Sequence, residues 1–177
     1  MRPSGLRSPS HHCWPFVLAA ALLVAGCPYG SEFPLGSSTE PILDTDLLGT
    51  WKPSSGSQED FTIVIRASAG ALLTVEADSP GEEPASYPAF VSAIGTERFL
   101  NLRDTGETGQ WYFANYRLDG ERLRLRLVED ELFESQVLPD AGELRAFLQR
   151  HLEDPRLYGG QGEEEWDWVL ERFTAGS

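Results

Sequence analysis

The fold is decided by residues 111–127, which read WYFANYRLDGERLRLRL. Two runs flank an Asp-Gly pair, and in the second run arginine and leucine alternate at every position. A period of two indicates a half-buried β-strand. Asp-Gly between two such runs favours a two-residue hairpin loop, because both loop residues need positive φ. The stretch therefore predicts an antiparallel hairpin that turns at Asp119 and Gly120.

This turn also predicts which residues face each other. Leu118 then lies opposite Glu121, and the inward pairs continue as Tyr116 with Leu123, Ala114 with Leu125 and Tyr112 with Leu127. We predict this surface to be the core face. The other surface pairs Arg117, Asn115, Phe113 and Trp111 with Arg122, Arg124, Arg126 and Val128. We interpret its arginine stripe as a solvated strand face paired to carboxylates, with an anion site as the alternative. Arginine stems or a helix would shield the two aromatic rings.

Short alternating runs of the same kind continue on both sides of the hairpin, separated by turn residues. With the hairpin included, the predicted strands are residues 47–52, 60–67, 71–77, 86–94, 98–103, 110–118, 121–129 and 166–173. Many short strands at such spacing indicate an antiparallel barrel or sandwich.

One segment carries apolar residues at helical spacing. Asp140 can cap its first turn, and Glu143, three residues later, can return the hydrogen bond. Pro155 ends the helix. The apolar stripe, which a single helix must bury against the sheet, consists of Leu144, Phe147, Leu148 and Leu152. We interpret this stripe as core.

The run Leu48-Gly49-Thr50-Trp51 resembles the first-strand motif of lipocalins, and the resemblance extends over residues 47–174. In that family the tryptophan plugs the closed end of an eight-stranded barrel, and an arginine of the last strand packs across it, which implies Arg172 here. The family's second motif, a turn of Thr-Asp-Tyr type, has no clear counterpart. We therefore predict a mainly β fold: an antiparallel up-and-down, lipocalin-like β-barrel of about eight strands, with one C-terminal amphipathic helix before the last strand. Another antiparallel barrel or a sandwich is the alternative.

The first residues have the features of an export signal. A basic lead with Arg2 and Arg7 precedes a mostly apolar run over residues 14–25, which at roughly twelve residues is too short for a membrane span of about 20. The run ends in LVAGC, residues 23–27, which resembles the lipobox of bacterial lipoproteins. The resemblance implies a signal peptide over residues 1–26.

In that family the lipobox cysteine, here Cys27, is acylated and becomes the new N-terminus. The alternative is an ordinary thiol, but the other cysteine, Cys13, lies inside the signal, so a disulfide within the mature chain is excluded. Two or three acyl chains on one residue would attach the protein stably to a membrane of the cell envelope. Pro28 stands where some bacteria read Asp as an inner-membrane signal, so the resemblance favours the outer membrane.

Residues 27–46 hold prolines, glycines and serines without apolar periodicity, so we predict a flexible tether there and one β-barrel domain over residues 47–174. Removal of residues 1–26 takes two of the 14 basic residues and none of the 28 acidic ones, which leaves a net charge of −16. Phosphate backbones would be repelled, so nucleic acid is excluded as a partner. Membrane attachment is then left to the acyl anchor.

The mature chain offers little to a catalytic mechanism. Its one histidine, His151, lies beside Leu152 near the helix end, where we expect a structural role. A Gly-x-Ser-x-Gly elbow and a Gly-rich phosphate loop are absent from the sequence, and His and Cys are too few for a zinc site. We expect a protein that is not an enzyme and needs no cofactor or metal. A carboxylate-dependent hydrolase is the alternative that the acidic residues leave open.

Two functions fit these features. The first is a membrane-tethered binding module, because an eight-stranded barrel is just wide enough to hold one small ligand. Its pocket for an apolar or amphiphilic ligand would be lined by Tyr112, Tyr116, Trp166 and Trp168, since the two tryptophans alternate and so aim at one face. The second is a structural or interaction lipoprotein with a filled barrel, which docks to an envelope protein. A cavity favours the first function and a solid core the second.

Overall fold

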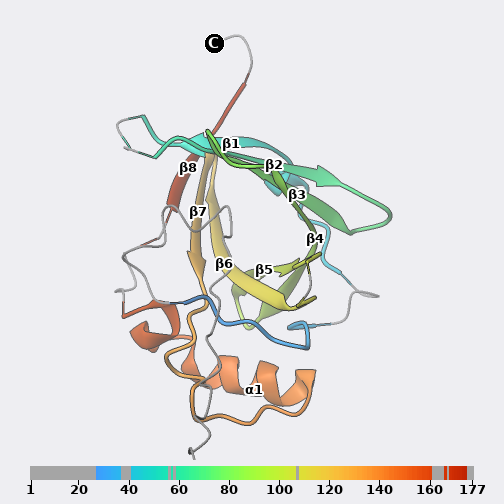
Figure 1. Ribbon diagram of the computed structural model, residues 1–177, viewed down its shortest axis with the longest axis vertical. Helices are drawn as coiled ribbons and strands as arrows, with labels where there is room; N and C mark the ends of the chain where they lie inside the picture. The colour runs from blue at the N-terminus through green and yellow to red at the C-terminus, as the bar shows by residue number, and fades with distance from the viewer. Residues whose placement is uncertain are drawn as a thin grey trace, which may run out of the picture.

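Eight antiparallel strands pair in chain order and close into a barrel (Figure 1). The computed structural model describes residues 27–36, 41–55, 57, 59–106, 108–160, 166 and 168–174. The strands are β1 (Gly49–Pro53), β2 (Thr62–Ala67), β3 (Leu73–Asp78), β4 (Ala85–Ile94), β5 (Glu97–Arg103), β6 (Trp111–Asp119), β7 (Arg122–Leu127) and β8 (Trp168–Arg172). The predicted up-and-down barrel is confirmed, and each strand begins and ends within two residues of its predicted range.

The connections differ in length between the two ends of the barrel. Short turns at residues 68–72, 95–96 and 120–121 lie at one end, which we call the hairpin end. The 3-10 helix η2 (Thr45–Leu47) precedes β1 at the same end. The opposite end, which we call the loop end, carries the longer connections, residues 54–61, 79–84, 104–110 and 128–167. The last of these contains the helix α1 (Ala141–His151) and the 3-10 helix η3 (Pro155–Tyr158).

The β6–β7 hairpin turns one residue later than predicted. Its loop residues are Gly120 and Glu121, and Asp119 pairs with Arg122. Gly120 has a φ of 60°, whereas no described residue other than glycine has a positive φ. A turn with glycine at its first loop position needs only that one positive φ, so Asp119 stays in the strand. The register therefore moves by two residues, and the same side chains still share each face.

The inward side chains of the strands form one apolar cluster, the interior cluster. On β6 and β7 its members are those that the alternation predicted, now with Tyr116 opposite Leu125 and Ala114 opposite Leu127. Apolar side chains from all eight strands meet there. The core face was thus predicted correctly although the partners across the hairpin were not.

A second apolar cluster, the outer cluster, covers the outside of β4, β5 and β6, on the side where α1 lies (Figure 1). Asp140 caps α1 as predicted, because its carboxylate accepts a hydrogen bond from the Glu143 backbone N–H at 2.9 Å. The predicted helix stripe is buried in this cluster, with Leu152 only partly covered. The sheet contributes Ile94, Phe99 and Phe113 to it.

The chain before β1 packs against the barrel wherever the structure describes it. Ser31 exchanges two backbone hydrogen bonds with Trp111, at 2.8 and 2.9 Å. Leu35 is fully buried in the outer cluster, and its N–H donates to Asn101 Oδ1 at 2.8 Å. Residues 27–36 and 41–46 differ in this from the flexible tether that we predicted for residues 27–46. The apolar side chains Tyr29, Phe33 and Leu35 account for the difference, because their burial stabilises the docked segment.

We predict that Leu125→Asp unfolds the domain. Leu125 lies in the interior cluster opposite Tyr116 and Trp168, where an unpaired carboxylate costs several kcal/mol against a total stability of about 5 to 15 kcal/mol. Arg124→Asp, one residue earlier on the outer face, should be tolerated. Urea unfolding followed by circular dichroism compares the two variants, and equal damage at both positions would contradict the inward assignment.

Candidate functional site

Trp51 closes the barrel interior at the hairpin end. Its side chain is fully buried, and its Nε1 donates a hydrogen bond to the carbonyl of Leu47 in η2 at 2.9 Å. Arg172 lies across the indole, with its guanidinium carbon 4.3 Å from the ring centroid. Arg172 also donates to the carbonyls of Leu48 and Asp46, at 2.5 and 2.6 Å. The contact between Trp51 and Arg172 that the lipocalin motif implied is therefore present.

Gly49 is required by the same arrangement. Its φ is 144°, a conformation that residues with a side chain rarely adopt. A Cβ at this position would also lie 2.6 Å from a terminal guanidinium nitrogen of Arg172. The glycine two residues before Trp51 thus leaves room for the arginine that covers the indole.

The solvent exposure of the inward side chains increases from the hairpin end toward the loop end. In the hairpin half, inward side chains are only 0 to 2 % exposed: Leu47, Trp51, Leu73, Val91 and Leu123. Nearer the loop end the inward side chains are 4 to 8 % exposed: Ile63, Ala77, Tyr87, Leu102, Leu127 and Trp168. Half-buried side chains pack against the same cluster at both ends: Phe61, Ala85 and Tyr112 at the loop end, and Leu48 and Leu118 at the hairpin end. Trp51 and η2 thus cover the interior at the hairpin end, and the buried inward side chains are more exposed toward the loop end.

Three of the four predicted ligand-site residues lie in or against the interior cluster. Tyr116 lies deep inside, and its hydroxyl donates a hydrogen bond to Asp44 Oδ2 at 2.8 Å. Burial, followed by this bond and the charge of Asp44, raises the pKa of Tyr116. Tyr112 is half-buried at the loop end. The Trp168 ring meets the edge of the Phe61 ring, with centroids 6.5 Å apart.

Trp166, the fourth predicted residue, lies on the outer side of the barrel. Its ring centroid is 4.8 Å from the guanidinium carbon of Arg126 and 5.5 Å from that of Arg117. The prediction assumed that Trp166 and Trp168 belong to one strand and so face one way. β8 begins only at Trp168, and the two-residue alternation applies only within a strand.

Two polar residues at the loop end were not predicted. Asp104 follows β5 in the inward series of that strand, and its backbone N–H donates to the Gln110 carbonyl at 2.8 Å. Tyr87 of β4 is 8 % exposed. Burial, followed by the charge of Asp104 and by Tyr112, raises the pKa of Tyr87. The alternation of residues 98–103, extended by one step, was the signal that could have found Asp104.

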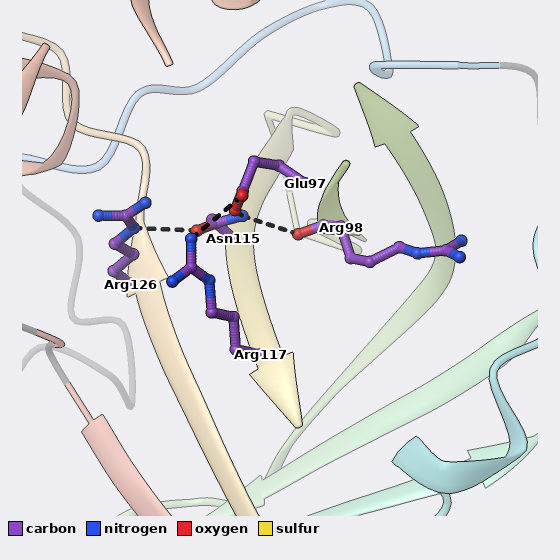
Figure 2. A network of polar contacts seen from close by, with 5 residues as sticks. All are labelled: Glu97, Arg98, Asn115, Arg117 and Arg126. Atoms are coloured by element: carbon purple, nitrogen blue, oxygen red, sulfur yellow. Dashed lines mark hydrogen bonds and ion pairs between the residues drawn. The ribbon is translucent and has the colours of Figure 1, made fainter. Parts of the chain in front are cut away.

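A polar network centred on two buried side chains, Asn115 and Arg126, lies on the outer face of β5, β6 and β7 (Figure 2). Asn115 is its centre and is fully buried. Its Oδ1 accepts a hydrogen bond from Arg126 Nε at 2.9 Å, and its Nδ2 donates to Glu97 Oε2 and to the Arg98 carbonyl, at 3.1 and 3.0 Å. Arg117 joins the network through an ion pair with the other oxygen of Glu97, at 3.1 Å.

Arg126 is buried, contrary to the prediction of a solvated arginine stripe. Its guanidinium carbon lies 3.7 Å from the ring centroid of Tyr158, which η3 brings over the strand. The prediction failed here because the connection after β7 folds back over this part of the sheet. At the other end of the stripe, Arg122 is half-exposed and pairs with Glu171 at 3.8 Å, as predicted. The network therefore joins the barrel to its outer layer.

Cys27, the predicted lipid attachment site, is exposed. Its carbonyl accepts a hydrogen bond from the Asp130 N–H at 3.0 Å, and Pro28 forms a β-bridge with Glu129. These contacts place Cys27 at the loop end, beside the chain that leaves β7. Residues 1–26, the predicted signal peptide, lie outside the described residues.

No protein-family model, no curated protein and no solved structure matches this chain. Within the part of the chain that the structure describes, no three His, Cys, Asp or Glu residues gather to form a candidate metal site. The helices of that part are too short or too polar to cross a bilayer. The candidate site thus depends on the geometry of the barrel.

We predict that Asn115→Ala lowers the free energy of unfolding by about 2 to 3 kcal/mol, because it removes the partner of the buried Arg126 Nε and of the Arg98 carbonyl. Arg117→Ala removes only the exposed arm of the same network and should cost about 1 kcal/mol or less. Denaturant titrations of both variants measure the difference. Equal losses would show that Asn115 does not support the network.

Proposed function

We propose that this protein is a lipid-anchored lipoprotein of the bacterial cell envelope whose lipocalin-like barrel binds a small apolar or amphiphilic ligand. One observation carries the ligand-binding part: Trp51 covers the interior at the hairpin end, and the buried inward side chains are more exposed toward the loop end. A barrel of eight strands can hold one small ligand. The protein acts by binding and not by catalysis.

The lining of the loop end supports an amphiphile. Leu102, Leu127 and Trp168 present apolar surface, and burial of a hydrocarbon chain against it contributes about 25 cal/mol per Å². At the rim, the Tyr112 hydroxyl donates a hydrogen bond to Gln110 Oε1 at 3.4 Å. The ligand's chain then points toward Trp51, and its head group stays at the loop end.

The anchor is proposed from the lipobox-like run at residues 23–27 and from the exposure of Cys27. An exposed sulfur can carry acyl chains without any rearrangement of the barrel. Two or more chains bind a bilayer stably, whereas one binds reversibly. Pro28 at the next position favours the outer membrane under the resemblance to bacterial lipoproteins.

The second candidate is a lipoprotein that docks to an envelope protein with a filled barrel. Val137, in the connection before α1, favours it because its side chain is 89 % exposed. A single exposed apolar residue is common on folded proteins, so this observation is the weaker one. The ligand titration below separates the two candidates.

Mass spectrometry of the membrane-bound protein should find a chain that starts at Cys27 and carries acyl mass. Cys27→Ser should move the protein to the soluble fraction, because it removes the sulfur that receives the acyl chains. Cys13→Ser, the matched change within the predicted signal, should leave attachment intact. Membrane retention of Cys27→Ser equal to that of the unaltered protein would contradict the anchor.

Titration with lysophosphatidylcholine and with 1-decanol should change tryptophan fluorescence saturably. Trp168→Phe should remove most of this response, since Trp168 lies in the interior cluster at the loop end. Trp166→Phe, two residues away on the outer side, should keep it. Calorimetry on both tryptophan variants should show that they still bind the ligand, so that a lost fluorescence response is not mistaken for lost binding. A flat titration with both compounds would favour the docking candidate.

A further inference from the structure

The carboxylate of Asp104 stands at the loop end of the barrel interior. Ala89 of β4 pairs with Leu102 of β5, so Tyr87 and Asp104, one inward step further along each strand, are neighbours. Asp104 Oδ1 accepts a hydrogen bond from the Gly106 N–H at 2.9 Å. These contacts hold a charged group where the head of a bound amphiphile would lie.

The loop end carries negative charge and little to balance it. The connections at residues 54–61, 79–84 and 104–110 contain six acidic residues, namely Glu59, Asp60, Glu82, Glu83, Asp104 and Glu107, and neither lysine nor arginine. Among the described residues, Asp104 forms no ion pair. The guanidinium of the neighbouring Arg103 instead lies 5.6 Å from the Trp111 ring. The rim therefore attracts cations and repels anions.

Tyr87 adds a second, independent sign of a ligand. Its side chain is more than nine-tenths buried, yet its hydroxyl makes no hydrogen bond with any described residue. The hydroxyl oxygen itself is not sealed from solvent, so a ligand that enters at the loop end can reach it. The Tyr87 hydroxyl is protonated at neutral pH, as an ordinary phenol is, and burial followed by the charge of Asp104 raises its pKa further. Its oxygen can then accept a hydrogen bond from an ammonium group.

Three further aromatic side chains lie at the loop end. Tyr112 and Phe61 are half-buried at this end, and Trp168 lies in the interior cluster against Phe61. Aromatic faces attract ammonium groups within about 6 Å, and more strongly when water is excluded. Aromatic rings at the same end of the barrel as the Asp104 carboxylate are therefore suited to a cationic head group.

We propose that the barrel selects amphiphiles with a cationic head group, whose ammonium contacts Asp104 and Tyr87 while the alkyl chain fills the interior. This proposal rests on the ligand-binding function proposed above and names the class of ligand. A ligand with a carboxylate head of the same size is repelled by the negative charge of Asp104, so its binding is disfavoured. A neutral alcohol avoids that repulsion but gains no attraction.

The test compares three ligands with one ten-carbon chain: decylammonium, 1-decanol and decanoate. It uses the full 177-residue chain with Cys27→Ser, so that no attached acyl chain competes for the interior. Calorimetry at neutral pH should rank their affinities in that order, with decylammonium about tenfold tighter than decanol. Asp104→Asn keeps the size of the side chain and should weaken decylammonium binding about tenfold while decanol binding is unchanged. Glu82→Gln removes the same charge from an exposed position of the rim and should change each affinity by roughly twofold or less.

Each outcome decides a different point. Suppose that decanol binds and that decanoate binds as tightly as decylammonium or more tightly. This result would overturn the head-group proposal and leave the ligand-binding function standing. Equal effects of Asp104→Asn and Glu82→Gln on decylammonium affinity would also overturn the head-group proposal and leave the ligand-binding function standing. Absence of binding by all three compounds would overturn the ligand-binding function and the head-group proposal with it.

Discussion

Arg172 and Trp51 stand opposite each other in the pair of β8 with β1, which joins the last strand of the barrel to the first. Without this pair the eight strands would form an open sheet with two unpaired edges, which invite pairing with other chains. The same guanidinium bonds to the carbonyls of Asp46 and Leu48, so it also fastens the segment that seals the interior. Both the sealed end and the definition of inside and outside depend on this closure. Closure also has a kinetic consequence, because pairing strands so distant in sequence slows folding.

The strands could be predicted from the sequence because the barrel imposes the same rule on every one of them. Inward residues must be apolar to fill the interior, so the period of two is visible in strands such as β3, where the inward Leu73, Val75 and Ala77 alternate with polar residues. The turn at Gly120 could not be predicted to the residue, since the same glycine serves two types of hairpin turn that differ by one position. The prediction of which side chains face inward stayed correct, because the register shifts by two residues, an even number.

The outer layer was harder to predict because its burial depends on distant segments. Arg126 has the sequence context of an exposed strand arginine and is buried only because Tyr158, from the connection after β7, covers it. Leu35 is buried because its N–H donates a hydrogen bond to Asn101 and its side chain packs in the outer cluster. At the candidate site the alternation predicted Tyr112 and Tyr116 but missed Asp104, which lies one step beyond the end of β5. Polar residues at strand ends carry no periodic signal of their own.

The one-sided position of α1 and the docked N-terminal segment gives the barrel two unlike walls (Figure 1). β5 buries four successive residues, Phe99 to Leu102, because both of its faces are covered. β2 and β8 bury alternate residues only, since their outer faces meet water. Local opening is cheapest where the fewest apolar contacts are lost. Amide hydrogens of β8, β1 and β2 should therefore exchange through smaller fluctuations than those of β5 and β6, and this thinner wall is the part of the barrel that opens most readily.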